Sequence, residues 1–212
     1  MNQGQKFASL IGSFLCWFAV FIQCYLMLQN RVTSIPEAMI RFFSYYTILT
    51  NTLCAVYYTI WVFGKPAGAA SFIRRSSSAT AILVYIMVVG LVYQIILRHT
   101  WDPQGLQKLI DELLHTLNPL FFLVYWWVFV RKASRLRWTM LGSWLIYPFL
   151  YLVFILLRGM ASGFYPYPFV DAGTIGYTKV FMNSLILLLV FSFLSLLFIS
   201  LTRIKNPVQT VN

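Results

Sequence analysis

Six apolar runs, each about as long as a membrane is thick, dominate this sequence. They cover residues 7–28, 42–62, 79–97, 113–130, 138–157 and 180–201. An α-helix needs roughly 20 apolar residues to cross about 30 Å of hydrocarbon. Apolar residues make up 60% of the chain and charged residues only 10%, a balance that a water-soluble domain of this size could not cover with polar surface. The sequence therefore predicts an all-α integral membrane protein, with residues 1–212 forming a single membrane domain, a six-transmembrane-helix bundle.

The distribution of basic residues predicts that both termini are cytoplasmic. With six helices the two ends of the chain share one side of the membrane, and cytoplasmic loops are enriched in Lys and Arg. We expect a multi-pass protein of the cell (inner or plasma) membrane, whose first run stays as a helix because no small-residue cleavage site follows it. Ten of the 16 basic residues fall on the side of the termini: Lys6, Lys65, Arg74, Arg75, Arg131, Lys132, Arg135, Arg137, Arg203 and Lys205.

Several classes of partner are not expected. The net charge of +11 is spread over short loops that a bilayer requires to be basic, so nucleic acid is not predicted. The three cysteines, Cys16, Cys24 and Cys54, lie inside apolar runs without CxxC spacing and are expected to be packing residues. With two histidines and few carboxylates, neither a metal site nor a cofactor is predicted.

Two polar stripes interrupt the apolar runs, one on the second run and one on the fourth. Unpaired polar groups are costly in hydrocarbon, so these stripes should face each other or a wet cavity. One interpretation is that they only hold two helices together through inter-helix hydrogen bonds. The stripes are Ser44, Thr47 and Asn51 at i, i+3, i+7, and Asp111, His115 and Asn118 at i, i+4, i+7.

Depth in the membrane favours a chemical pair within these stripes. Ser44 lies three residues past Arg41, and His115 lies three residues past Glu112, so each is roughly 5 Å inside its last charged residue. A hydroxyl beside an imidazole is the minimum unit for nucleophilic acyl transfer, because the ring takes the proton as oxygen attacks a carbonyl. Asp111, one turn from the histidine, either orients the ring or faces the lipid headgroups.

The segment between the fifth and sixth runs offers two further features. Tyr165, Tyr167 and Phe169 alternate with prolines, which favours an extended aromatic segment at headgroup depth that could cover a lipid-facing opening. Arg158, at the outer end of the fifth run, either binds a carboxylate or phosphate headgroup or is an interfacial arginine that reaches toward water.

Three short segments resemble a known family. RFFSYYTILTN at the start of the second run, HTLNPLFF in the fourth and SGFYPYPF after the fifth resemble, in order and spacing, the androgen-induced transmembrane protein family, which includes the androgen-dependent TFPI-regulating protein. The resemblance covers roughly residues 40–180. It implies a bacterial member of a family of multi-pass membrane hydrolases that cleave fatty acid esters of hydroxy fatty acids with an intramembrane threonine and a histidine.

The resemblance can be carried onto individual positions. The family's threonine follows a basic-aromatic-apolar triplet, and here the triplet that begins at Arg41 precedes Ser44, so Ser44 resembles the nucleophile with serine in place of threonine. Thr47, one turn deeper, is the competing hydroxyl. His115 resembles the family histidine, which stands in a His-Thr pair before a proline, although the spacing to Pro119 differs by one residue from the family form.

Together the residues and the resemblance predict an intramembrane hydrolase of lipid-like esters, active toward the outer leaflet of the membrane. Ser44 is the expected nucleophile and His115 the general base and acid. An amide could stabilise the oxyanion or position the ester, and Asn51, Asn118 and Asn183 are the candidates. The alternative is a small transporter or lipid-binding protein without catalysis, and a scaffold with no ligand is a second alternative.

Overall fold

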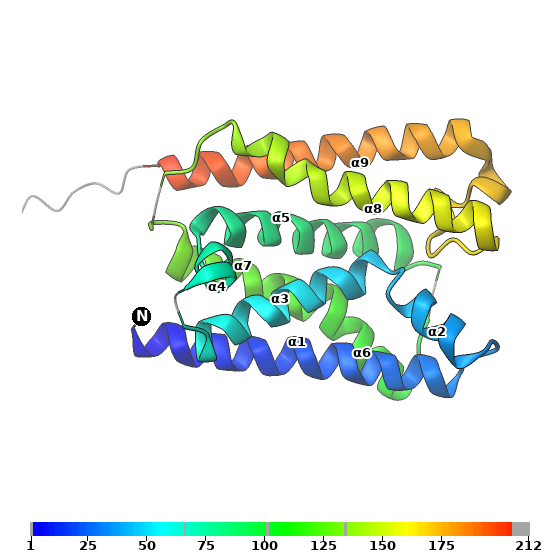
Figure 1. Cartoon of the computed structure of the whole chain (residues 1–212), viewed down its shortest axis with the longest axis horizontal. Helices are drawn as coiled ribbons and strands as arrows, with labels where there is room; N and C mark the ends of the chain where they lie inside the picture. Colours follow the sequence, from blue (N-terminus) through cyan, green and yellow to red (C-terminus); the bar gives the residue numbers. More distant parts are fainter. Residues whose placement is uncertain (1, 66, 101, 134, 205–212) are drawn as a thin grey trace, which may run out of the picture.

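The computed structural model describes residues 2–65, 67–100, 102–133 and 135–204, and in these ranges every regular element is helical. The long helices run roughly parallel to one another (Figure 1). In chain order the elements are α1 (Gln3–Gln29), α2 (Ile35–Phe42), α3 (Tyr46–Phe63), α4 (Gly68–Ile73), α5 (Ser76–Val92), η1 (Tyr93–Leu97), α6 (Gly105–Glu112), η2 (Leu113–Leu117), α7 (Asn118–Tyr125), η3 (Trp126–Val130), α8 (Met140–Ser162), η4 (Pro168–Val170) and α9 (Ala172–Arg203).

Within the ranges that the structure describes, five helical stretches are long and apolar enough to cross a membrane. Many of their large apolar side chains point away from the protein, including Phe14, Phe149 and Leu189, which are each more than half exposed. Such continuous apolar surface requires lipid around it, so the chain is a membrane-embedded helical protein. The five stretches are Gln3–Gln29, Ser76–Leu97, Gly105–Val130, Met140–Ser162 and Ala172–Arg203.

The second apolar run, expected at residues 42–62, forms α3, and a separate shorter helix, α2, precedes it. α2 begins after Ser34, whose side chain accepts the Glu37 N–H, and it ends at Phe42. A turn follows, and α3 starts at Tyr46, where the side chain of the N-cap residue Tyr45 makes no capping hydrogen bond. α3 is not among the five apolar stretches, because polar residues such as Asn51 and Thr47 lower its mean hydropathy.

The fourth and sixth runs begin earlier than expected. The fourth is continuous from Gly105 to Val130, through α6, η2, α7 and η3. The sixth begins at Ala172, because Asp171 caps the backbone N–H groups of Gly173 and Thr174. Gly176 adopts φ 77°, a left-handed conformation that glycine tolerates, and it kinks α9 after its first turn.

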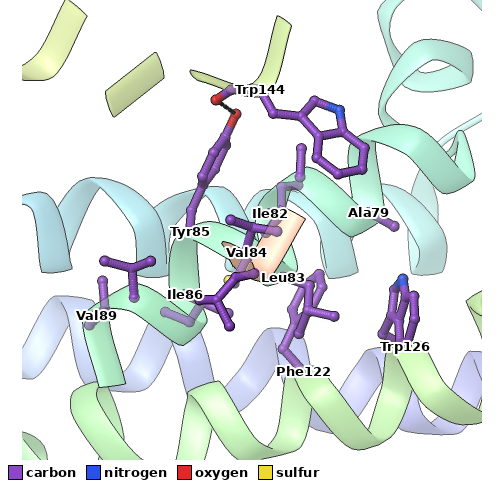
Figure 2. Close-up of a cluster of buried hydrophobic side chains, with 14 of the residues drawn as sticks. Ala79, Ile82, Leu83, Val84, Tyr85, Ile86, Val89, Phe122, Trp126 and Trp144 are labelled. Carbon is purple, nitrogen blue, oxygen red and sulfur yellow. Dashed lines mark hydrogen bonds between the residues drawn. The ribbon is translucent and has the colours of Figure 1, made fainter. Parts of the chain in front are cut away.

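α5 lies at the centre of the core. Its residues Leu83 and Ile86 are fully buried, and Phe122 and Trp126 of the α7–η3 stretch pack against it (Figure 2). Two polar groups of α5 in this core have partners, which lowers the cost of burying them away from water. The Trp126 Nε1–H donates to Thr80 Oγ1 over 2.8 Å. The Tyr85 hydroxyl donates to the backbone carbonyl of Trp144 over 2.7 Å, which links α5 to α8.

α1 packs closely on α3 where Gly12 meets the ring of Tyr58. A Cβ atom added at Gly12 would lie 2.6–2.8 Å from the ring of Tyr58, which is fully buried. We expect Gly12→Ala to lower stability by about 1–3 kcal/mol, because the ring has no space to move into.

Gly142→Ala is the matched control, because nothing lies within 4 Å of a Cβ added to this helical glycine. Alanine should raise stability there by about 0.5–1 kcal/mol through its helix propensity. Thermal unfolding of the two variants in detergent measures the difference, and equal midpoints would contradict the α1–α3 packing.

Candidate functional site

A cavity of about 780 Å³ lies at the end of the bundle where α2, α6 and the segment 164–167 meet. We call it the site cavity. One part of its wall is apolar and includes Leu26, Met27 and Ile48, while its polar lining includes Gln23, Asn30 and Gln107. The chemically important side chains that line it are Thr47, Tyr93, Asp111, His115 and Tyr167.

Thr47, His115 and Asp111 form a hydrogen-bonded line in this cavity. Thr47 Oγ1 lies 3.3 Å from His115 Nε2. The other ring nitrogen, Nδ1, lies 3.1 Å from Asp111 Oδ1 and 2.9 Å from the Asp111 backbone oxygen. Thr47 and Asp111 are both buried. A hydroxyl, an imidazole and a carboxylate in this order have the arrangement needed to activate the hydroxyl as a nucleophile.

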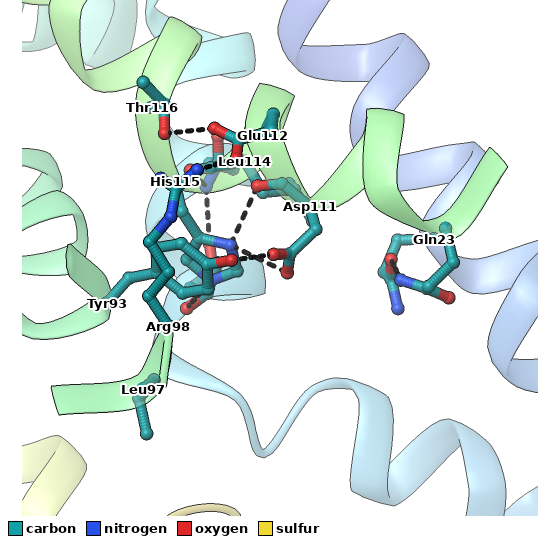
Figure 3. Close-up of polar contacts among 12 residues, drawn as sticks. Gln23, Tyr93, Leu97, Arg98, Asp111, Glu112, Leu114, His115 and Thr116 are labelled. Carbon is teal, nitrogen blue, oxygen red and sulfur yellow. Dashed lines mark hydrogen bonds and ion pairs between the residues drawn. The ribbon is translucent and has the colours of Figure 1, made fainter. Parts of the chain in front are cut away.

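Tyr93, which no pattern in the sequence singled out, fixes the histidine from a third side. Its ring stacks on the His115 ring, with centroids 4.1 Å apart and an interplanar angle of 13°. Its hydroxyl donates to Asp111 Oδ2 (Figure 3). Tyr93 therefore orients both the imidazole and the carboxylate. No polar spacing marks it, because it follows the apolar α5 helix, which carries no polar stripe.

His115 lies in a widened turn of helix, η2. Pro119 explains why one backbone carbonyl of this turn has no backbone donor. In η2 the Asn118 N–H bonds to Leu113 O, five residues back. The next residue, Pro119, has no N–H and cannot donate a hydrogen bond to the Leu114 carbonyl. That carbonyl accepts instead from Asn51 Nδ2, at 3.2 Å. A widened turn of this kind, a π-helix turn, is frequently found at functional sites.

Asn51 uses both of its amide hydrogens within the protein. Besides Leu114 O, it donates to Thr47 O at 2.9 Å, and its own oxygen accepts from Asn118 Nδ2 at 2.8 Å. Asn183 Nδ2 donates to the carbonyl of Phe169 at 2.9 Å. None of these three asparagines lines the site cavity. The three side chains therefore link elements of the bundle outside the lining of the site cavity.

Ser44 is not paired with His115 in the described part of the chain. Its hydroxyl is fully buried and donates to Ile40 O at 2.7 Å, and its backbone oxygen accepts from the Tyr151 hydroxyl at 2.8 Å. The break between α2 and α3 is the physical reason. A continuous helix would carry Ser44 on the face of Thr47, whereas the turn directs it back toward α2 and brings Thr47 to the histidine.

Arg158 takes part in a clasp at the mouth of the site cavity. Glu37 Oε1 accepts from Arg41 Nε at 2.8 Å and from Arg158 at 2.9 Å, so one carboxylate joins α2 to α8. Both guanidinium groups lie against the ring of Phe164, with centroid distances of 4.6 Å for Arg41 and 4.7 Å for Arg158. This clasp holds the segment that carries Tyr167 against α2.

Comparisons of the chain with family models, curated proteins and solved structures find no match. The resemblance of its three motifs to the androgen-induced transmembrane protein family stays an expectation. Among the residues that the structure describes, no group of three or more His, Cys, Asp or Glu side chains is placed to hold a metal ion. The functional interpretation therefore depends on the geometry of the site cavity.

The hydrogen bonds of Asn51 to the Thr47 and Leu114 carbonyls should stabilise the fold. Asn51→Leu should lower the free energy of unfolding by about 1–3 kcal/mol, because the Leu114 carbonyl would be buried without a donor. Thr52→Val is the control, since the buried Thr52 hydroxyl has no hydrogen-bond partner among the described residues. Thermal unfolding in detergent measures both. An Asn51→Leu variant as stable as Thr52→Val would show that the link contributes nothing.

The stabilisation that the clasp provides should depend on pH, because it requires an ionised Glu37. The hydrogen bond from Arg41 holds the pKa of Glu37 below its ordinary value, with a further contribution from Arg158. A lowered folded-state pKa means that the clasp stabilises the protein fully above the ordinary Glu pKa and loses this effect as pH falls through the lowered value. The difference in unfolding midpoint between the native protein and Glu37→Gln should therefore be constant above about pH 5 and shrink toward pH 3. A difference that does not change over this range would contradict the clasp.

Proposed function

We propose that this protein is an intramembrane hydrolase of lipid-like esters, such as fatty acid esters of hydroxy fatty acids, with Thr47 as the nucleophile. The observation that carries the proposal is the line from Thr47 Oγ1 through the His115 ring to Asp111, beside an apolar cavity. Thr47 replaces Ser44 in this role, because Ser44 has no contact with the histidine. Threonine is also the residue type that the family resemblance implies.

The chemistry assigned to these residues balances in two steps. His115 Nε2 takes the proton of Thr47 as Oγ1 bonds to the ester carbon, and the carbonyl electron pair moves to oxygen. The intermediate collapses, the bond to the alcohol breaks, and His115 returns the proton to the leaving alkoxide. Water then attacks the acyl-threonine with the same base, which releases the acid and restores the Thr47 hydroxyl. Asp111 stabilises the imidazolium that forms in each step.

The position of Thr47 on α3 supports its role. Thr47 is the second residue of this helix. The helix dipole gives an N-terminus a partial positive charge, which favours negative charge developing on Thr47 Oγ1 or on a nearby oxyanion. The asparagines Asn51, Asn118 and Asn183 are not part of the proposed site, because their amide groups bond elsewhere.

We propose a six-span topology in the cell membrane, with α3 as the sixth span and both termini in the cytoplasm. The positive-inside rule supports this orientation, because the loops at the end of the bundle opposite the site cavity carry most of the basic residues. The site cavity then opens toward the outer leaflet. A fatty acyl chain would lie against the apolar wall formed by Leu26, Met27 and Ile48.

Removing the Thr47 hydroxyl is the direct test. Thr47→Ala should lower hydrolysis of p-nitrophenyl octanoate, and labelling by a fluorophosphonate probe, by about 10³-fold or more. Thr47→Ser, which keeps a hydroxyl, should retain activity. Ser44→Ala is the matched control and should react like the native protein, because the Ser44 hydroxyl only bonds to Ile40 O.

Three outcomes separate the alternatives. If Ser44→Ala loses the label and Thr47→Ala keeps it, Ser44 is the nucleophile and not Thr47. Native protein that is folded, and neither hydrolyses the ester nor takes the label, would favour a lipid-binding protein or a transporter over a hydrolase. Labelling that survives both substitutions would place the reactive group outside this site.

A further inference from the structure

The hydroxyl of Tyr167 contacts the proposed nucleophile directly. It lies 3.3 Å from Thr47 Oγ1 and accepts the backbone N–H of Thr47 at 3.2 Å. Tyr167 belongs to the segment between α8 and η4, so its contact with α3 joins residues 120 positions apart in the chain. It is buried and lines the site cavity.

The protons available on each group fix the direction of the two hydrogen bonds made by Thr47 Oγ1, one with His115 and one with Tyr167. His115 Nδ1 faces two acceptors on Asp111, so this nitrogen carries the ring proton. In the neutral ring Nε2 is then an acceptor, and Thr47 Oγ1 donates its one proton there. Thr47 has no second proton to give, so in the contact with Tyr167 the tyrosine donates.

Packing of its ring holds Tyr167 in place independently of its hydroxyl. The ring stacks on Phe169, with centroids 5.2 Å apart and an interplanar angle of 6°. The ring of Tyr45 meets it edge-on at 5.7 Å. Because these contacts do not involve the oxygen, a phenylalanine at position 167 can keep the same position.

Tyr167 keeps its proton over the whole physiological range. Burial raises the pKa of its phenol to about 12, although the hydrogen bonds to Thr47 act in the opposite direction. A neutral phenol is a hydrogen-bond donor, whereas a phenolate would repel a developing negative charge. The group is thus available as a donor wherever His115 can act as a base.

We infer that Tyr167 is a catalytic residue, which donates its hydrogen bond to Thr47 Oγ1 in the free protein and to the ester oxyanion during the reaction. The inference rests on the proposed hydrolase function. A tetrahedral carbon bonded to Thr47 Oγ1 carries its oxyanion two bonds away, within reach of a hydroxyl that already lies 3.3 Å from that atom. The hydrogen bond shifts to the oxyanion as the carbonyl electron pair moves there, and the proton stays on the tyrosine.

The test compares Tyr167→Phe with Tyr165→Phe in the purified full-length protein. Tyr165 lies in the same segment but does not line the site cavity, and its hydroxyl has no hydrogen bond to the described site residues. With p-nitrophenyl octanoate as the probe, we expect Tyr167→Phe to lower kcat about 10²- to 10³-fold with KM little changed. Tyr165→Phe should keep the native kcat and the native unfolding midpoint. Tyr167→Phe should stay folded with a lower midpoint, because the buried Thr47 N–H loses its acceptor.

A second variant keeps the experiment decisive if Tyr167→Phe fails to fold. Incorporation of 3,5-difluorotyrosine at position 167 preserves the ring and lowers the phenol pKa, so activity should gain a new loss at alkaline pH where the fluorinated phenol ionises. A structural role for the hydroxyl predicts no such change in the pH profile.

The outcomes distinguish this inference from the proposed function. Native protein that hydrolyses the ester, together with a Tyr167→Phe variant that turns over equally fast, would overturn the role of Tyr167 and leave the hydrolase intact. An unaltered pH profile in the fluorinated protein would do the same. Folded native protein without any turnover would overturn both the hydrolase and the role of Tyr167.

Discussion

A backbone carbonyl that has lost its helical partner is the constraint on which the site depends. Pro119 cannot donate to Leu114 O, and hydrocarbon offers no water as a substitute. Asn51 supplies the missing donor from α3 and also bonds to the carbonyl of Thr47. One buried amide therefore sets the position of Thr47 relative to the turn that carries His115. The hydrogen bond between the two side chains is a consequence of this backbone link.

The same widened turn explains how the polar stripe on the fourth run is used. Spacing of i, i+4, i+7 predicts one common face for Asp111, His115 and Asn118 on a regular α-helix. A π-helix turn contains one extra residue and rotates the next part of the helix about its axis. Asp111 and His115 accordingly line the site cavity, whereas Asn118 bonds to Asn51 outside it. The stripe is divided between a chemical part and a part that holds helices together.

Hydropathy and polar spacing were sufficient to predict the helical membrane class and to single out His115, Asp111 and Thr47 among a few candidates. They were insufficient at the break between α2 and α3, because RFFSYYTILTN contains neither glycine nor proline and reads as a continuous helix. Depth in the membrane and the family triplet favour Ser44, whereas the break brings Thr47 to His115. Tyr93 and Tyr167 reach the site through tertiary contacts that no local spacing encodes. The signals for Tyr167 are the aromatic and proline-rich composition of its segment and its place in the SGFYPYPF motif.

Ester hydrolysis inside a membrane requires an apolar environment for the acyl chain and water for the second step. The site cavity combines these conditions, with an apolar wall near Ile48 and polar side chains such as Gln23 and Gln107, which join α1 to α6 by a 2.8 Å hydrogen bond. A base that serves both steps must reach the nucleophile and also water. In the proposed reaction His115 meets this requirement, because it borders the cavity while the stacked ring of Tyr93 and the carboxylate of Asp111 hold it in one orientation. The rigidity of this arrangement, rather than the acidity of any one group, is what would make a threonine hydroxyl reactive at this depth.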